Sequence, residues 1–252
     1  MTKNHNSYCQ LLCGIFLLGL LLLPNVIEAQ ISQKGTPYGL NNTTVLSIPS
    51  ETMPVLDVDA LRVEDLEDER DNVPPRFGFS HLVNYNLENN GNWTKLSNGD
   101  RLWHFRLNTQ EGLSVNLKFN EFFLPKGAKL FLYNETGTQV LGAYTAENNK
   151  RSRKFSTNLV KDNHLIVEYY EPANVAEEGV LNIGTVVQGY RHIRLPYKAF
   201  GDSGPCNIDT ECDQGNGWEN QSASVGMYII DGERWCTGTL INNASQDCTP
   251  YF

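Results

Sequence analysis

The chain has 252 residues, of which 19% are charged and 40% are hydrophobic, and its formal net charge at pH 7 is −9. With 20 basic residues against 29 acidic ones, it lacks the positive surface that a nucleic-acid backbone requires. Composition therefore argues against a nucleic-acid partner. The balance is instead typical of a soluble acidic protein.

Residues 1–29 have the three-part layout of a secretory signal peptide. Lys3 provides the charged region, an apolar run follows from Leu11 to Leu23, and Ala29 and Gln30 flank the predicted cleavage point. The apolar run is short for a bilayer span, so no stable membrane anchor is expected. Cleavage would remove one basic and one acidic residue, which leaves the net charge unchanged and predicts a secreted, extracellular protein.

The cysteines are distributed unevenly. Two of the six leave with the signal peptide, and the other four all lie in the last quarter of the chain: Cys206, Cys212, Cys236 and Cys248. This distribution indicates that a disulfide-bearing unit begins there and that a cysteine-free unit precedes it, as expected for an exported protein.

Residues 30–75 form an acidic lead segment that is poor in aromatic residues. The stretch VDALRVEDLEDERDNVPP has apolar residues at loosely helical spacing within a dense run of carboxylates. It predicts a short acidic helix closed by Pro74 and Pro75, with a solvated linker as the alternative. Asp57 and Asp59 lack the loop glycine and the further ligands of a calcium site, so calcium binding is not expected.

Residues 76–195 change to a period of two. The segment contains β-branched and aromatic runs, namely RLWHFRLN, LSVNLKFNEFFL, AKLFLYN, HLIVEYYE and VLNIGTVVQGY. Turn residues separate these runs, as in SNGD and NETGT. Regularly spaced strands with no amphipathic helix between them predict an all-β fold, an antiparallel β-sandwich of jelly-roll or immunoglobulin-like kind.

The histidines and aromatic residues of this segment give no sign of a cofactor. Four histidines lie at no ligand spacing, so no metal site is expected: His81, His104, His164 and His192. Alternating aromatic residues in strands are expected in the core: Trp93, Trp103, Phe105, Phe119, Phe122 and Phe123. The alternative for these rings is a carbohydrate site, because β-sandwiches also bind glycans.

Residues 196–252 are rich in Gly, Asn and Cys. The pattern predicts a β-hairpin made of the strands SASVGMYII and RWCTGTLIN, which the turn DGE joins. A third strand would begin at TPYF. This region resembles the start of the mature domain of bacterial lysyl endopeptidases. The resemblance rests on CNID, which begins at Cys206, on the second cysteine, Cys212, and on the stretches SVGMY and CTGTLINN. These enzymes are a secreted branch of the trypsin-like serine proteases. A weaker likeness to their β-rich propeptides extends upstream through GDRLWHFRL and LPKGAKLFLY.

The resemblance implies an incomplete first barrel of a trypsin-like double β-barrel. Its catalytic histidine, aspartate and serine are expected beyond Phe252, so these residues alone should be inactive. Preference for lysine is implied by the subfamily only. The family also implies that Cys206, Cys212 and Cys236 pair with later cysteines, whereas Cys248 has no counterpart. The alternative is a self-contained disulfide unit, for which four cysteines allow three pairings.

Ser203 lies in GDSGP, which is similar to the loop that carries the nucleophile of trypsin-like proteases. A nucleophilic serine needs a base, and no histidine follows Ser203. In the family the nucleophile comes far downstream of the CTGTLI strand, and GDSGP lacks the second glycine of GDSGGP. Ser203 is therefore predicted to lie near a mature N-terminus and not to be catalytic.

The stretch RHIRLPYKAF joins the two units and offers basic residues beside a proline. It is the kind of segment in which proteolysis occurs. Cleavage after Lys198 would suit a lysine-specific enzyme, whereas a cut between Phe200 and Gly201 would need another protease or trimming. We expect activation cleavage between Pro196 and Asp202.

Taken together, the sequence predicts the N-terminal part of a secreted serine endopeptidase precursor that acts on protein or peptide substrates and needs no cofactor. The propeptide would pack on its own protease domain. One alternative is a secreted β-sandwich adhesion or glycan-binding protein with a disulfide-stapled tail, which would require an exposed aromatic platform. Another is a short product that inhibits a protease, because propeptides often occupy the cleft of their enzyme.

Overall fold

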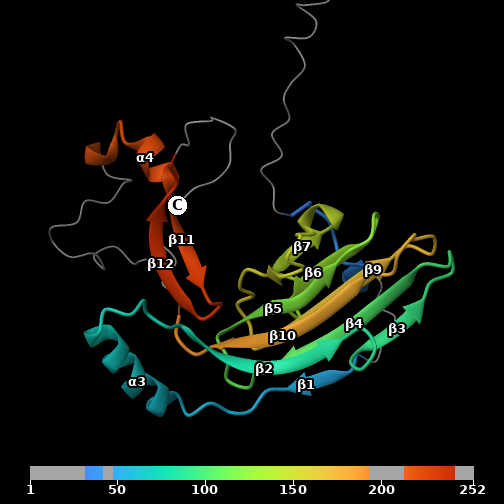
Figure 1. Ribbon diagram of the computed structural model, residues 1–252, viewed down its shortest axis with the longest axis horizontal. Coiled ribbons are helices and arrows are strands. Elements are labelled where there is room, and N and C mark those ends of the chain that lie inside the picture. The colour runs from blue at the N-terminus through green and yellow to red at the C-terminus, as the bar shows by residue number, and fades with distance from the viewer. Residues whose placement is uncertain (1–31, 42–47, 193–212, 242–252) are drawn as a thin grey trace, which may run out of the picture. The chain divides into compact units, whose positions relative to one another are not determined.

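The computed structural model describes residues 32–41, 48–192 and 213–241. In these ranges strands dominate and helices are few, which confirms the all-β prediction. The strands form two larger sheets and one hairpin, and no sheet closes into a barrel within the described ranges (Figure 1).

The first sheet has six strands. Its order is β1-β4-β9-β6-β7, and β3 also pairs with β4. The strands are β1 (Ser50–Thr52), β3 (Asn92–Lys95), β4 (Arg101–Asn108), β6 (Lys129–Tyr133), β7 (Val140–Tyr144) and β9 (His164–Glu171). All pairs are antiparallel except β1 with β4, which is parallel and therefore departs from the predicted antiparallel pattern.

The second sheet has four antiparallel strands in the order β2-β10-β5-β8. They are β2 (Gly78–Asn86), β5 (Ser114–Phe123), β8 (Phe155–Ser156) and β10 (Val180–Gly189). Strand β10 is paired along its length with β2 on one side and β5 on the other, so it is the central strand and is buried over most of its length.

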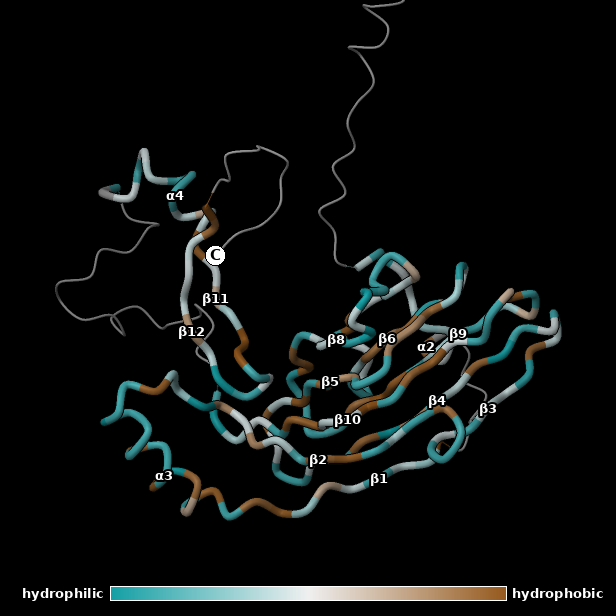
Figure 2. Tube along the Cα trace, viewed as in Figure 1, coloured by the Kyte–Doolittle hydropathy of each residue, from teal (hydrophilic) through white to brown (hydrophobic). Residues whose placement is uncertain are grey.

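The core lies between the two sheets, which makes this unit a sandwich. Its cluster of buried side chains includes Phe105 and Leu107 of β4, Leu117 of β5, Val167 of β9 and Val186 of β10. Figure 2 shows hydrophobic stretches on the central strands, including β6 and β10. Period-two alternation in the sequence places these residues on one face of each strand, which is why the sheets bury them together.

The predicted core aromatics are buried in four of six cases. Trp103, Phe105, Phe119 and Phe122 expose 1 to 2% of their surface. The other two, Trp93 and Phe123, are half-buried. Trp93 packs against the core with its ring edge-on to Tyr169, at 5.8 Å between ring centroids.

Part of the lead segment joins the sandwich. Helix α2 (Tyr38–Asn41) and the residues before it lie along the first sheet, where Gln33 and Ala143 exchange backbone hydrogen bonds. Met53, just after β1, is 2% exposed and belongs to the core cluster. The boundary between residues 75 and 76 stays a prediction, but residues before it contribute to the sandwich.

The predicted acidic helix is confirmed as α3 (Val58–Arg70), and the alternative of a solvated linker does not hold for these residues. Asp57 caps its start by accepting a hydrogen bond from the Ala60 N–H at 3.0 Å, so this carboxylate serves the helix terminus. The helix ends at Arg70, and Asn72 follows in the left-handed region with φ 58°. Pro74 and Pro75 then prevent its continuation.

The predicted hairpin is confirmed as β11 (Val225–Ile230) and β12 (Arg234–Thr239). Its turn has Asp231 at φ 53° and Gly232 at φ 84°, the Asp-Gly pattern that suits the twist of a tight hairpin. Three short helices complete the described structure: η1 (Ala146–Asn148), η2 (Asp213–Gly215) and α4 (Glu219–Ser224). In the described part of the chain, no helix has the length and apolarity needed to cross a membrane.

Candidate contact site between the sandwich and the C-terminal hairpin

Most residues singled out from the sequence fall outside the described ranges: Ala29, Gln30, Lys198, Phe200, Gly201, Ser203, Cys206, Cys212 and Cys248. Their predicted roles stay predictions. Cys236 is described, and it lies exposed on β12 with a free thiol. Its pairing with a later cysteine also stays a prediction.

The tip of the hairpin docks on the start of the sandwich by backbone hydrogen bonds. The Phe77 N–H donates to the Glu233 carbonyl at 2.8 Å, and the Trp235 N–H donates to the Pro75 carbonyl at 3.0 Å. Between these bonds Arg76 and Arg234 form an antiparallel β-bridge. The hairpin therefore binds by adding a short strand to an extended segment, a mode in which the main chain supplies the affinity.

Two side chains of β5 bind the turn itself. Asn116 is buried, and its Nδ2 donates to the Gly232 carbonyl at 3.0 Å. Lys118 Nζ donates to the Asp231 carbonyl at 2.9 Å. Gly232 is needed here, because its φ is positive and a Cβ would lie 2.9 Å from Lys118 Cδ. The sandwich thus approaches the turn too closely for an ordinary side chain.

A small apolar cluster lies beside these hydrogen bonds. Phe77 and Val187 are fully buried and Leu159 nearly so, and Ile229 and Trp235 from the hairpin pack against them. This cluster is separate from the main core between the sheets. The contact therefore combines apolar burial with main-chain pairing.

Helix α3 contributes charge to the same site. Arg234 donates from Nη2 to Asp68 Oδ2 at 2.7 Å and from Nη1 to the Pro74 carbonyl at 2.8 Å. The side chains of Arg234 and Asp68 are 20% and 31% exposed. A charge-assisted bond in this half-buried setting is stronger than one between neutral groups.

Asp65 of α3 is the centre of a neighbouring polar cluster and is 4% exposed. It accepts hydrogen bonds from Arg76 Nε at 3.0 Å, from the Tyr190 hydroxyl at 2.8 Å and from Arg191 Nη1 at 3.2 Å. Burial, followed by the hydrogen bond to Asp65, raises the pKa of the Tyr190 hydroxyl. Burial alone would lower the pKa of Arg76, but its bonds to Glu64 and Asp65 raise it. Both groups therefore keep their protons at physiological pH.

A second buried carboxylate holds the N-terminal residues on the first sheet. Glu168 accepts bonds from His104 Nε2 at 3.1 Å, from the Tyr133 hydroxyl at 3.0 Å, and from the N–H groups of Tyr38 and Gly39 at 2.5 and 2.8 Å. Burial alone would raise the pKa of Glu168, but the bonds from His104 and the two N–H groups lower it. The two bonds from the N–H groups tie the start of α2 to β9.

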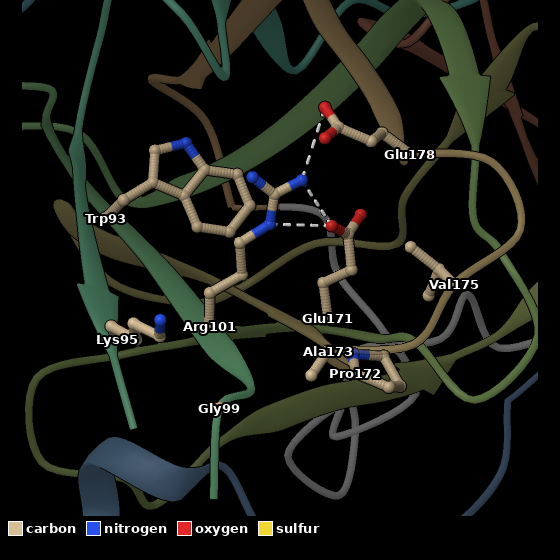
Figure 3. A pocket seen from close by; sticks show the side chains of 9 residues that line it. All are labelled: Trp93, Lys95, Gly99, Arg101, Glu171, Pro172, Ala173, Val175 and Glu178. Carbon is tan, nitrogen blue, oxygen red and sulfur yellow. Dashed lines mark hydrogen bonds and ion pairs between the residues drawn. The ribbon is translucent and has the colours of Figure 1, made fainter. Parts of the chain in front are cut away.

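The sandwich has an open pocket of about 610 Å³ whose charges neutralise one another. As Figure 3 shows, the Arg101 guanidinium lies over the Trp93 ring, 4.4 Å from its centroid. It donates from Nε to Glu171 at 2.7 Å and forms an ion pair with Glu178 at 3.3 Å. Since Arg101 covers the face of Trp93, the pocket offers no free aromatic platform on that face. The glycan-binding alternative is not favoured.

The histidines have separate neighbours rather than a common one: His81 with Gln188, His104 with Glu168, and His164 with Asp162. Across residues 32–41, 48–192 and 213–241, no group of three or more His, Cys, Asp and Glu side chains is placed to hold a metal ion.

Sequence reasoning did not identify the residues that carry this contact, chiefly Asp65, Asp68, Asn116 and Arg234. A signal was present in the charges, because the acidic run EDLEDER is matched by arginines at positions 76, 191 and 234. Charge complementarity alone does not indicate which pairs form across so long a separation in the chain.

Comparison with known proteins gives one family match, over the last residues of the chain. The fold is an all-β sandwich followed by an exposed two-stranded unit with a free cysteine. Residues 200–252 match the family model described as "Lysyl endopeptidase, C-terminal domain". This match supports a lysyl endopeptidase-like, protease-related protein. No solved structure matches the chain.

Proposed function

We propose that the chain is the N-terminal part of the precursor of a secreted serine endopeptidase. The signal peptide covers residues 1–29, the lead segment and the sandwich form the propeptide, and the trypsin-like domain begins in residues 196–252. The observation that carries this proposal is the family match over residues 200–252, which begins shortly after the last sandwich strand ends at Gly189. Family likeness also supports export.

The proposed chemistry is acyl transfer. A serine attacks the peptide carbonyl, a histidine takes its proton and later returns it to the leaving amine, and an aspartate orients the histidine. All three are expected beyond Phe252, because the family order puts them after the strand that contains Cys236. Residues 1–252 alone are proposed to be inactive, since a trypsin-like cleft needs two complete barrels. Preference for lysine follows from the subfamily only.

The sandwich is proposed to bind the protease domain in the precursor. Support comes from the docking of the hairpin tip, where Asn116, Lys118 and Asp68 contact residues within the family match. Asn116 and Lys118 bind carbonyls of the turn, and Asp68 binds the arginine that follows it. The specificity of these contacts favours a propeptide over a chance neighbour.

The proposal is tested by N-terminal sequencing of the protein secreted from cells that express the complete reading frame. We expect a new N-terminus between Pro196 and Asp202, in the stretch that contains Lys198. A mature chain that begins well outside this window would contradict the precursor interpretation, as would a secreted protein that keeps the sandwich covalently attached. A substitution of Lys198 to Gln tests whether the cut follows the lysine.

A further inference from the structure

We propose that helix α3 is an acidic clasp that holds the chain on both sides of residues 193–212, so that cleavage there leaves the sandwich and the hairpin together as a two-chain complex. The inference rests on the proposed function, because that function supplies the cleavage. The inference adds two features to the proposed function: the contact surface that persists after the cleavage, and the helix that maintains this surface.

The upstream side of this stretch is held by Asp65 and Glu69. Tyr190 donates its hydroxyl proton to Asp65, and Arg191 forms ion pairs with Asp65 at 3.2 Å and Glu69 at 3.4 Å. Tyr190 and Arg191 directly follow β10, so the end of the sandwich is held up to the residue before His192, where this described range ends.

The downstream side is held by the same helix. Arg234 of β12 binds Asp68 at 2.7 Å. Asp68 and Glu69 follow Asp65 by three and four residues, which places each of their side chains next to that of Asp65 on the helix surface. A single helical surface therefore binds an arginine from each side of residues 193–212.

Phe77 couples the two sides through its backbone. Its carbonyl accepts hydrogen bonds from the N–H groups of Tyr190 at 2.9 Å and Arg191 at 3.1 Å, and its own N–H donates to Glu233 at 2.8 Å. None of these bonds uses a residue between 193 and 212. Cleavage between residues 193 and 212 removes the covalent link, so the hairpin no longer has the high effective concentration that the link provides. Every described contact between the two parts stays in place.

The kind of partner that fits this surface is a β-hairpin with an Asp-Gly-Glu turn followed by an arginine. The turn carbonyls meet Asn116 and Lys118, the glycine allows close approach, and the arginine meets Asp68. Because one ion pair is half-buried and the remaining bonds all end on main-chain carbonyls, the complex should weaken with added salt but persist at physiological ionic strength.

The test uses the complete secreted precursor, with positions 198–203 replaced by the recognition site of a sequence-specific protease. After cutting, gel filtration and native mass spectrometry measure whether the two pieces stay together, and a dilution series gives the Kd. We expect one complex of both pieces. Asp68→Asn should raise the Kd about tenfold, because it leaves Arg234 without its carboxylate. Arg234→Gln should act alike, and the double variant should add little to either change.

Glu67→Gln is the matched control, since it removes one charge from the same helix at an exposed position for which the described structure shows no side-chain bond. It should leave the Kd within about twofold of the parent value. Circular dichroism before cutting confirms that every variant is folded. Separation of the parent pieces at micromolar concentration would overturn the clasp, as would equal effects of Glu67→Gln and Asp68→Asn.

Failure of this inference is distinguishable from failure of the proposed function. Pieces that separate after the engineered cut contradict the clasp but leave the protease assignment standing. A complete precursor that is never cut between Pro196 and Asp202 contradicts the proposed function, whereas the engineered cut still measures the clasp.

Discussion

Arg234 of β12 donates to Asp68 of α3 at 2.7 Å, across 166 positions of sequence. The acidic lead segment and the protease-like hairpin are therefore in direct contact, although the whole sandwich lies between them in the chain. This contact gives the carboxylates of α3 a role as ligands of arginines.

Gly232→Ala should loosen the hairpin tip. The substitution places a Cβ at a residue with φ 84°, 2.9 Å from Lys118 Cδ and 3.3 Å from Val187 Cγ2, and should cost about 1 kcal/mol or more. Hydrogen exchange at the Phe77 and Trp235 N–H groups should become faster, because both bond across the contact.

The control for this substitution is Gly217→Ala. Gly217 also has a positive φ, 89°, but among the described residues no atom outside Gly217 and its chain neighbours lies within 4 Å of its Cβ position. Its exchange effects should be confined to its own neighbourhood. If both variants speed up hydrogen exchange at the Phe77 N–H equally, backbone strain, and not close approach to the sandwich, explains why position 232 requires glycine.

Asp65→Asn should destabilise the sandwich by about 3 kcal/mol, because it leaves Arg76 and Arg191 close to a buried neutral group. Urea unfolding followed by fluorescence measures the change. Glu64→Gln removes a second partner of Arg76 at an exposed position and should cost less than about 1 kcal/mol. Equal losses for the two variants would contradict the central role of Asp65.

Stability should fall in acid through Glu168. Its folded-state pKa lies below the usual value of about 4.5, so its contribution is fully present above that pH and is lost as the pH falls through the folded-state pKa. Urea unfolding at a series of pH values should show this decline, and Glu168→Gln should make it shallower. A variant with an unchanged slope would show that other carboxylates account for acid unfolding.

The cysteines should not pair with one another in the N-terminal part of the complete secreted protein. Mass spectrometry of non-reduced peptides should connect Cys206, Cys212 and Cys236 to cysteines beyond Phe252, as the family likeness implies. The free, exposed thiol of Cys236 is available for such a partner. A bond between any two of these three would favour a self-contained disulfide unit.

The strands were predictable from sequence where local pattern decides them. Alternation along β4 and β5, and the Asp-Gly turn before Arg234, are local signals that were interpreted correctly. The parallel strand β1 was not predicted, because its three residues are all exposed and show no alternation. It forms only through pairing with residues 106–108 of β4.

The charged residues of the contact site are visible in the sequence, but the pairs that they form could not be predicted from it. An acidic helix and three distant arginines are visible in the sequence, yet the pairing of Asp68 with Arg234 depends on how the whole sandwich folds between them. The buried position of Asn116 against the Gly232 carbonyl has no local signal, since a strand asparagine is more often exposed. Long-range packing decides both the Asp68–Arg234 pair and the burial of Asn116.

The central claim is that this chain begins a serine endopeptidase whose nucleophile is not Ser203. The most direct measurement is hydrolysis of lysine-containing peptide substrates by the complete secreted protein, in its native form and as Ser203→Ala, with and without a serine-acylating inhibitor. We expect inhibitor-sensitive cleavage after lysine at equal rates in both forms. Absence of this activity from the complete protein, or its loss in Ser203→Ala, would contradict the claim.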